Sequence, residues 1–480
     1  MTRSKKLIAL GAVFLLLCAA TFLIMHTEKK QENIRNTDEI VLEIPYEDMV
    51  NVKWKNFGSD EELSFTKGEE WKYDGDESFP VDEELMEKLL EPFTALGADF
   101  IIESPEDMKQ YGFDEPACEI EISTADESFM IKLGDFSQMD NQRYISTGDG
   151  NVYLIDDDPF PRFNRDYTDF IKNDEIPEID KVDSISFQSD DFFKITRNEE
   201  EDRNTLREDD IFFTEADGEE VPLSTQTVTD YVNVLKYLRF ENFADYNADE
   251  ADLEKYGLDD PELIFSIEFI SRDDEGNEVP GTVKISISRD PEELEAVKDD
   301  SLTEDSSAEN TEEEETITAY IRLNDSPIIY NMISSDYTKL MKHDFNDFRH
   351  REIIPCDFDD ISEIEATLDG VTYKITSEIK DDVRNYFYDG EQIDITDIRD
   401  SVNFLKADEF INTSSDEKKE LSLKFTMDFE NDPATYVDIY RYDGENCLIT
   451  IDGNSFALTE RRKAVELIED INSLVLKKAE

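Results

Sequence analysis

The sequence predicts an α+β protein built from tandem repeated modules, each a mostly antiparallel sheet backed by an amphipathic helix, behind one N-terminal transmembrane helix. Three observations predict this: an apolar run near the N-terminus, a duplicated Tyr-Gly segment, and short alternating strands that flank helical apolar stripes. The expected order is a cytoplasmic leader and anchor at 1–30, a first module at 40–179, a second at 180–356 and a third, divergent module at 357–480.

The N-terminal segment predicts a membrane anchor. Residues 7–25 form an uninterrupted apolar run preceded by Arg3, Lys5 and Lys6. A helix of this length rises about 28 Å, which spans a hydrocarbon core. Basic residues ahead of the run predict a cytoplasmic leader, with the bulk of the chain outside the cytoplasm. A cleaved signal peptide is the alternative, but the apolar run continues past the small residues 18–20.

One decapeptide occurs twice. Residues 107–116 and 252–261 share the pattern Asp-x-x-x-Tyr-Gly-x-Asp-x-Pro. Glycine can end a turn with a positive φ, and proline keeps the chain extended before the next strand. We interpret both copies as structural turns with buried tyrosines rather than as ligand grips. The repeat-motif residues are Tyr111, Gly112, Asp114, Pro116, Tyr256, Gly257, Asp259 and Pro261.

Each module carries one helix whose apolar residues recur at helical spacing. The third copy has such a helix but lacks the Tyr-Gly turn. Residues 169–177 resemble 347–355, each just ahead of the next module. The predicted helix faces are Leu85, Met86, Leu89, Leu90, Phe93 and Leu96; Val228, Tyr231, Val232, Leu235 and Leu238; and Ile395, Ile398, Val402 and Leu405. Strands are expected near 50–56, 62–67, 71–75, 118–124, 182–187, 192–196, 211–213, 263–270, 361–368, 371–376, 421–429, 436–442 and 448–451, and a last helix over 461–477.

Composition sets further limits. The formal net charge of −72 repels nucleic acid and anionic lipid, so a nucleic-acid role is excluded. Weak, nonspecific binding of divalent cations stays open. Residues 290–316 contain almost no large apolar residue, which predicts a disordered acidic insertion between two strands of the second module.

The sequence predicts no catalytic residue, no cofactor site and no metal site. Neither a phosphate-binding loop nor a dinucleotide fingerprint occurs. His343 and His350 lack the spacing of a zinc site, and we expect them at the surface. Cys118, Cys356 and Cys447 lie far apart in the sequence. One disulfide bridge among them remains an alternative, but the spacing favours buried free thiols.

Several of these features together resemble one bacterial family, "domain of unknown function 4340", over roughly residues 40–345. The resemblance rests on Trp71-Lys-Tyr73, the helix entry Phe79-Pro-Val-Asp82, the decapeptide at 107–116, Leu133-Gly134, Arg143-Tyr144 and Val152-Tyr-Leu154. It implies an N-terminally anchored extracytoplasmic protein, often found beside ABC-2-type transporter components similar to the gliding-motility export system. The family brings no established catalytic residues.

The first hypothesis for function is therefore a non-catalytic binding or scaffold protein, an auxiliary component of an ABC-type transport or envelope system. It would contact the membrane through its N-terminal helix and a protein partner through its modules. Two alternatives are a cell-surface hydrolase that uses paired carboxylates and a cation-dependent envelope adhesin. With 120 Asp and Glu residues, chance carboxylate pairs are too common to decide between them.

Overall fold

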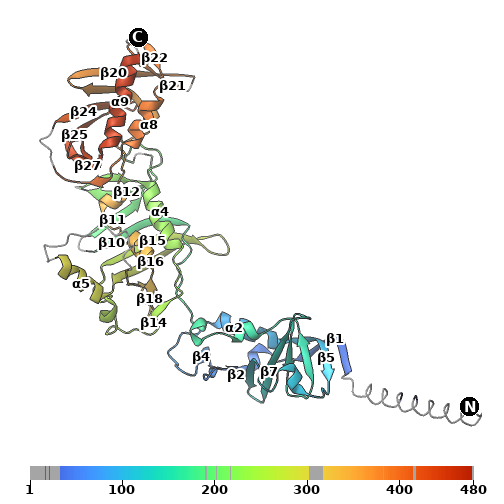
Figure 1. The fold of residues 1–480 in the computed structure, drawn as a ribbon. Coiled ribbons are helices and arrows are strands. Elements are labelled where there is room, and N and C mark those ends of the chain that lie inside the picture. Colours follow the sequence, from blue (N-terminus) through green and yellow to red (C-terminus); the bar gives the residue numbers. More distant parts are fainter. Residues whose placement is uncertain are drawn as a thin grey trace, which may run out of the picture. The chain divides into compact units, whose positions relative to one another are not determined.

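The computed structural model describes residues 33–189, 192–201, 203–216, 218–301, 317–381, 383–413 and 418–477, together with Leu17 and Thr21. These residues form three nine-stranded, mostly antiparallel sheets with helices against them, which confirms the predicted α+β class (Figure 1). The chain divides into two compact units, Met1–Asp174 with Asp245–Ala248, and Glu175–Ala244 with Asp249–Glu480. The three-module division stays a prediction.

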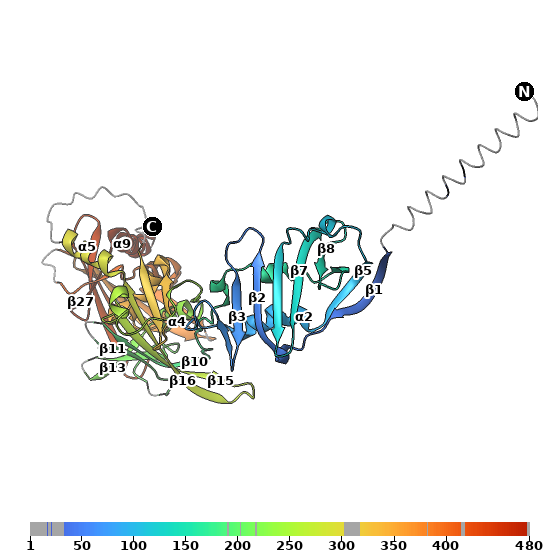
Figure 2. The ribbon, with the colours of Figure 1, turned by 90° about the horizontal axis from the view of Figure 1, so that it is seen from below.

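The first sheet lies in the first unit. Its strand order is β1-β5-β9-β8-β7-β6-β2-β3-β4. Helix α2 (Glu83–Thr94) lies against this sheet, as Figure 2 shows. The Asp82 carboxylate caps α2 by accepting hydrogen bonds from two backbone amides of its first turn. The strands are β1 (Asn33–Leu42), β2 (Met49–Asn56), β3 (Leu63–Lys67), β4 (Trp71–Tyr73), β5 (Leu96–Glu103), β6 (Cys118–Thr124), β7 (Ser128–Ser137), β8 (Gln142–Ser146) and β9 (Val152–Ile155); the short helices are η1 (Tyr46–Asp48), η2 (Met108–Tyr111), α3 (Phe160–Phe163) and η3 (Tyr167–Phe170).

The second sheet has the order β13-β12-β11-β10-β15-β16-β17-β18-β14. Helix α4 (Thr225–Lys236) buries an apolar stripe and is capped by the Ser224 hydroxyl. The strands are β10 (Lys181–Gln188), β11 (Phe192–Arg197), β12 (Phe212–Ala216), β13 (Glu219–Leu223), β14 (Phe243–Asp245), β15 (Leu263–Arg272), β16 (Glu278–Arg289), β17 (Ala319–Leu323) and β18 (Ile329–Met332); the other helices are η4 (Leu253–Tyr256), α5 (Pro291–Ser301), α6 (Ser334–Leu340) and α7 (Phe345–Phe348).

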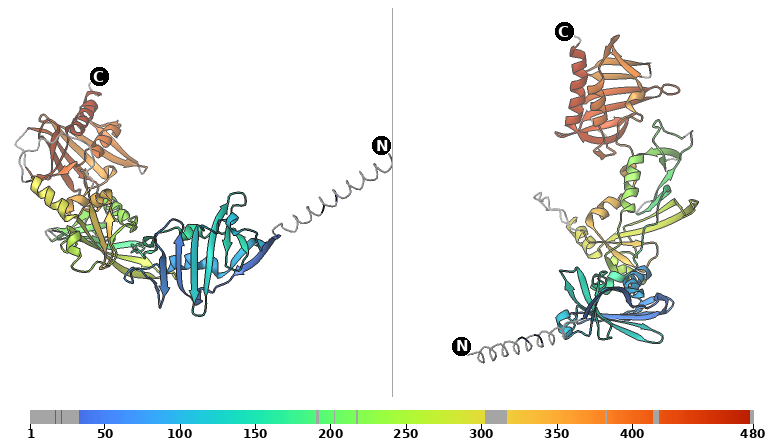
Figure 3. Two further views of the ribbon diagram at one scale, coloured as in Figure 1. Left: turned by 60° about the horizontal axis from the view of Figure 1, so that its bottom comes forward. Right: turned by 90° about the vertical axis from the view of Figure 1, so that its right-hand side faces the viewer.

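The third sheet has the order β22-β21-β20-β19-β24-β25-β26-β27-β23. Helices α8 (Thr396–Phe404) and α9 (Arg461–Lys477) pack against each other, and Figure 3 shows α9, in red at the C-terminal end, lying along this sheet. The strands are β19 (Ile361–Leu368), β20 (Val371–Lys380), β21 (Val383–Tyr388), β22 (Glu391–Ile393), β23 (Glu409–Phe410), β24 (Lys419–Met427), β25 (Ala434–Arg441), β26 (Asn446–Ile451) and β27 (Asn454–Glu460), preceded by η5 (Phe358–Asp360).

The three sheets share one strand order. Read from the opposite end, the first eight strands of the second and third orders match the run from β5 to β4 in the first sheet, and β1, β13 and β22 are additional edge strands. The central pairs β2–β6, β10–β15 and β19–β24 each carry a register shift near the start of the first strand, at Val50, Asp183 and Ser362 respectively. A bulge at the same position in all three sheets indicates that the third sheet repeats the same architecture despite lacking the Tyr-Gly turn.

The connection after the first two sheets is also repeated. Phe170 at the end of η3 and Phe348 at the end of α7 are fully buried. Both short helices begin with an aspartate whose carboxylate forms a reciprocal capping box with an aspartate three residues later. The ring of Phe170 lies 5.7 Å from that of Trp54 on β2, and Phe348 lies 5.4 Å from Phe187 on the equivalent strand β10.

The two Tyr-Gly turns lie in equivalent surroundings. Tyr111 and Tyr256 are buried at the ends of η2 and η4, and the glycines after them have φ of 83° and 66°. The Tyr111 ring lies 5.0 Å from Tyr144 on β8, and the Tyr256 ring lies 5.0 Å from Tyr320 on the equivalent strand β17. Asp114 and Asp259 are exposed, and Pro116 and Pro261 are half-buried.

One strand and four predicted helix-face residues differ from the structure. Strand β1 was not predicted, and its Ile34 and Ile40 are exposed at a sheet edge. Leu96 begins strand β5 and Leu238 follows the end of α4, so neither lies on its predicted helix face. Ile395 and Leu405 are the two caps of α8 rather than members of it, although both are buried.

Residues 290–301 are not the disordered segment that was predicted. Pro291–Ser301 forms α5, because proline suits a first helical position and the Asp290 carboxylate accepts a hydrogen bond from the Glu292 amide. The Glu293 side chain accepts another from the Thr318 amide. Residues 302–316 lie outside the described residues. So does the predicted anchor at 7–25, apart from Leu17 and Thr21. Among the described residues, no helix combines the length and apolarity needed to cross a membrane.

We expect Gly134→Ala to lower the free energy of unfolding of the first unit by about 1–3 kcal/mol. Gly134 lies in β7 under the Tyr111 turn, where an added methyl group would overlap the Tyr111 carbonyl oxygen. Chemical denaturation of the purified protein measures the loss. Gly97→Ala in β5 is the matched control, because nothing lies within 4 Å of the methyl group it adds. Equal effects of the two substitutions would contradict the tight contact.

Candidate functional site

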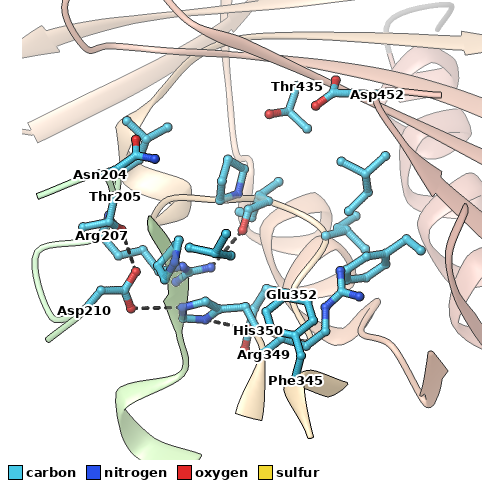
Figure 4. A pocket seen from close by; sticks show the side chains of 18 of the residues that line it. Asn204, Thr205, Arg207, Asp210, Phe345, Arg349, His350, Glu352, Thr435 and Asp452 are labelled. Carbon is cyan, nitrogen blue, oxygen red and sulfur yellow. Dashed lines mark hydrogen bonds and ion pairs between the residues drawn. The ribbon is translucent and has the colours of Figure 1, made fainter. Parts of the chain in front are cut away.

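A cavity of about 500 Å³ lies within the second unit, between the second and third sheets (Figure 4). One wall is the loop between β11 and β12, including residues 203–207 and Asp210. A second wall is the segment 349–355, which joins α7 to η5 and is called the joint segment below. The third wall comes from the third sheet, with Thr435, Asp452 and Phe456 among its residues.

The joint segment is tied to both sheets by its backbone. The Ser224 amide, at the start of α4, donates to the carbonyl of Phe348 just before the segment. On the other side the Ala407 amide donates to the Arg351 carbonyl at 2.8 Å, and Glu352 pairs with Lys406 in an isolated β-bridge. The segment is therefore ordered by contacts that come from elements on either side of it.

His350 lies between two carboxylates. Its Nε2 is 3.0 Å from Oδ1 of Asp210, and its Nδ1 is 3.6 Å from Oε2 of Glu352. Asp210 is 1% exposed, and its other oxygen accepts a 2.6 Å hydrogen bond from the Thr205 hydroxyl. Glu352 also forms a 2.8 Å ion pair with Lys406. A carboxylate of the second-sheet loop is thus joined through one imidazole to a carboxylate of the joint segment.

These contacts change the ionisation of the pair. Burial lowers the pKa of His350, but its hydrogen bond to Asp210 and its ion pair with Glu352 outweigh burial and raise that pKa to about 9. The contact with His350 holds the pKa of Glu352 well below its usual range, with a further contribution from Lys406. His350 is therefore an imidazolium at neutral pH, in ion pairs with both carboxylates.

Arg349, the first residue of the joint segment, lies among aromatic rings. Its guanidinium carbon is 4.9 Å from the Phe345 ring centroid, 4.4 Å from Phe410 and 4.9 Å from Phe456. A guanidinium stacks favourably on aromatic faces. Burial lowers the pKa of Arg349, but a guanidinium stays charged at neutral pH. Within the described residues the only hydrogen bond of its side chain is a 3.4 Å contact to Asn346 Oδ1.

Two other arginines organise the loop wall. Arg203 donates to the backbone carbonyls of Asp210, Glu200 and Glu208. Arg207 donates to the Ile354 carbonyl at 2.9 Å and so holds the loop to the joint segment. Both guanidinium groups serve mainly to shape the chain, because their partners are mostly backbone carbonyl groups.

A comparison with protein families gives one match. The family described as "Domain of unknown function (DUF4340)" matches residues 71–261 and 247–424. The chain belongs to this family. The two matches overlap at 247–261, which contains the second Tyr-Gly turn. Comparisons with curated proteins and with solved structures found no match.

Of the histidines and repeat-motif residues that the sequence of this DUF4340 protein singles out, His350 is the one that lines the cavity. The eight repeat-motif residues are absent from the cavity lining, as is His343, whose Nδ1 lies 2.9 Å from the Met341 carbonyl oxygen. His350 was expected at the surface, but its side chain is only 22% exposed. Among the described residues no group of three His, Cys, Asp or Glu side chains could hold a metal ion.

The three described cysteines, Cys118, Cys356 and Cys447, are free and buried, so no bridge joins them. Burial raises the pKa of Cys118 and of Cys356 to about 12, and that of Cys447 to about 11. A thiol is nucleophilic only as the thiolate, so these residues act as small apolar side chains.

We expect the stability of the second unit to fall as pH rises from about 6.5 to about 9. The folded state binds the His350 proton more tightly, with a pKa of about 9 against 6.5 for a free imidazole. The contribution is complete below pH 6.5 and lost above pH 9, and it amounts to ~3 kcal/mol at most. Asp210 and Glu352 favour the proton, Arg207 opposes it, and Lys406 competes for Glu352.

Thermal unfolding across this pH range measures the effect. In His350→Gln the slope between pH 6.5 and 9 should disappear. His343→Gln, which removes an imidazole outside the cavity, should keep the slope of the original protein. An unchanged slope in His350→Gln would show that other groups cause it.

Proposed function

We propose that this DUF4340 protein is a membrane-anchored, extracytoplasmic binding and scaffold protein. It would serve as a non-catalytic auxiliary component of an ABC-type transport or envelope system. The repeated sheets would provide the surface for a protein partner, and the N-terminal apolar run would hold them at the membrane.

One observation carries the non-catalytic part of the proposal. The ionisable groups that line the cavity are engaged with charged side chains, with backbone groups or with aromatic rings. Both ring nitrogens of His350 face carboxylates, at 3.0 Å from Asp210 and 3.6 Å from Glu352, so the imidazole is not arranged to take a proton from a substrate. The Thr205 hydroxyl donates to Asp210 rather than to the imidazole, so it is not arranged as an activated nucleophile.

The location outside the cytoplasm is supported by the sequence. The apolar run at 7–25 follows Arg3, Lys5 and Lys6, as expected for a signal anchor. The resemblance to anchored relatives beside ABC-2-type transporters points the same way. The strongly acidic surface suits a protein that must not adhere to anionic headgroups.

We expect the full chain, solubilised with mild detergent and captured from its native membranes, to bring down a permease and an ATPase. Mass spectrometry of the captured material measures this. The control is the same chain without residues 1–30, which should leave the membrane fraction and lose those partners. Capture of the intact chain alone, after crosslinking in the membrane, would count against a transport role.

The second candidate is a cell-surface hydrolase. It is favoured by one observation, the carboxylates Asp210 and Glu352 on either side of His350 in a cavity. Its test is release of nitrophenol from a panel of nitrophenyl glycosides and esters by the purified protein. Activity that Glu352→Gln abolishes would favour the hydrolase over the scaffold. The cation-dependent adhesin has no comparable observation in its favour.

A further inference from the structure

The cavity between the second and third sheets is unusually rich in cations for this chain. Three arginines (Arg203, Arg207, Arg349) and His350 line it together with three carboxylates. The whole chain has 48 Lys and Arg against 120 Asp and Glu. Much of the remaining lining is apolar, contributed by side chains such as Ile353, Ile354 and Phe456.

Arg349 differs from the other cations of the cavity in what surrounds it. His350 is paired with two carboxylates, and Arg203 and Arg207 are bonded to backbone carbonyl groups. Among the described residues no carboxylate forms an ion pair with Arg349, and three aromatic rings surround its guanidinium. Aromatic faces stabilise the positive charge but accept few of the five N–H donors.

We propose that this cavity binds a small amphiphilic anion, whose acidic group pairs with Arg349 and whose apolar body lies against Ile353, Ile354 and Phe456. The inference rests on the proposed binding role and adds the chemical class of the ligand. A carboxylate fits because it can accept two parallel hydrogen bonds from one guanidinium. A volume of about 500 Å³ is within the range of small-molecule sites.

The arrangement in Figure 4 agrees with such a ligand. Arg349, Phe345 and His350 lie on one side of the cavity in this view, and Thr435 and Asp452 lie on the other. An acidic group at Arg349 would also be near the imidazolium of His350, the next residue. Thr435 offers a hydroxyl on the far side. His350 is already paired with Asp210 and Glu352, so Arg349 is the cation that defines where the charged head of the ligand binds.

Charge discriminates this site from nonspecific binding. The field of a chain with a net charge of −72 favours cations everywhere on its surface. An apolar patch alone would bind neutral and charged amphiphiles with the same tail equally well, except that the field of the chain would favour the cationic one. A preference for the anion therefore requires a local cation, and the described lining supplies Arg349.

The test uses three water-soluble probes with one phenylpropyl tail: 4-phenylbutyrate, 3-phenylpropanol and 3-phenylpropylamine, which is an ammonium at neutral pH. The full chain is held in nanodiscs of uncharged lipid, and empty nanodiscs give the background. Calorimetric titration measures each affinity. We expect 4-phenylbutyrate to bind at least ~10-fold more tightly than the amine. Arg349→Gln should weaken the carboxylate by about 10- to 100-fold and leave the alcohol unchanged.

Two variants serve as controls. Arg239→Gln removes an arginine whose side chain is 81% exposed and which does not line the cavity, and it should not change any affinity. Arg349→Lys is the second variant, for use if Arg349→Gln does not fold. It keeps a cation among the rings, so it should retain part of the preference for the anion. Equal affinities for the three probes, or tighter binding of the amine, would overturn the inference. The titration contains no partner protein, so its failure is distinct from failure of the membrane capture.

Discussion

In each of the three sheets, one antiparallel strand pair joins two parts of the chain that are far apart in sequence. β2 pairs with β6, β10 with β15 and β19 with β24, and each pair connects an N-terminal hairpin to a later meander. The loop that such a pair closes has an entropic cost. Buried apolar residues on both strands offset it, for example Phe187 opposite Phe265, each with no exposed surface. Without this pairing the two halves of the sheet would share no edge, and the helix between them would have no face to cover.

The prediction of this architecture rested on the periodic spacing of apolar residues. It failed for elements in which buried residues do not recur at the spacing of a strand or a helix. Alternating residues predicted β19 and β24, and the helical stripe of Val228, Tyr231, Val232 and Leu235 predicted α4. Strand β1 was missed because it lies at a sheet edge with most of its residues exposed, so its sequence has no apolar alternation. The start of the acidic insertion was misjudged because composition indicates solubility, whereas a proline at the first helical position and a capping carboxylate decide whether a short helix forms.

The candidate site could not be predicted in the same way. Asp210 and His350 are 140 residues apart, and neither belongs to the repeated decapeptide. Their contact depends on how the β11–β12 loop meets the joint segment, which no local pattern describes. The family matches illustrate the same point, because they begin at Trp71 and at residue 247 rather than at the first strand of a sheet. The sequence repeat that the family matches follow therefore begins at a different point of the chain from the repeat of the sheets.

The joint segment also shows how this acidic chain can bring two sheets together. Arg349, His350 and Arg351 are three consecutive basic residues at the place where the second and third sheets approach. Repulsion between exposed carboxylates falls off over about 8 Å at physiological salt, so it acts mainly where surfaces meet. His350 forms ion pairs with Asp210 and Glu352. Arg351 donates hydrogen bonds to the carbonyls of Ala407 and Asp408. Arg349 is the member of this run that lines the cavity without a carboxylate or a backbone carbonyl against its guanidinium among the described residues. A cation held beside a cavity in an otherwise anionic protein is a basis for selecting an anionic ligand.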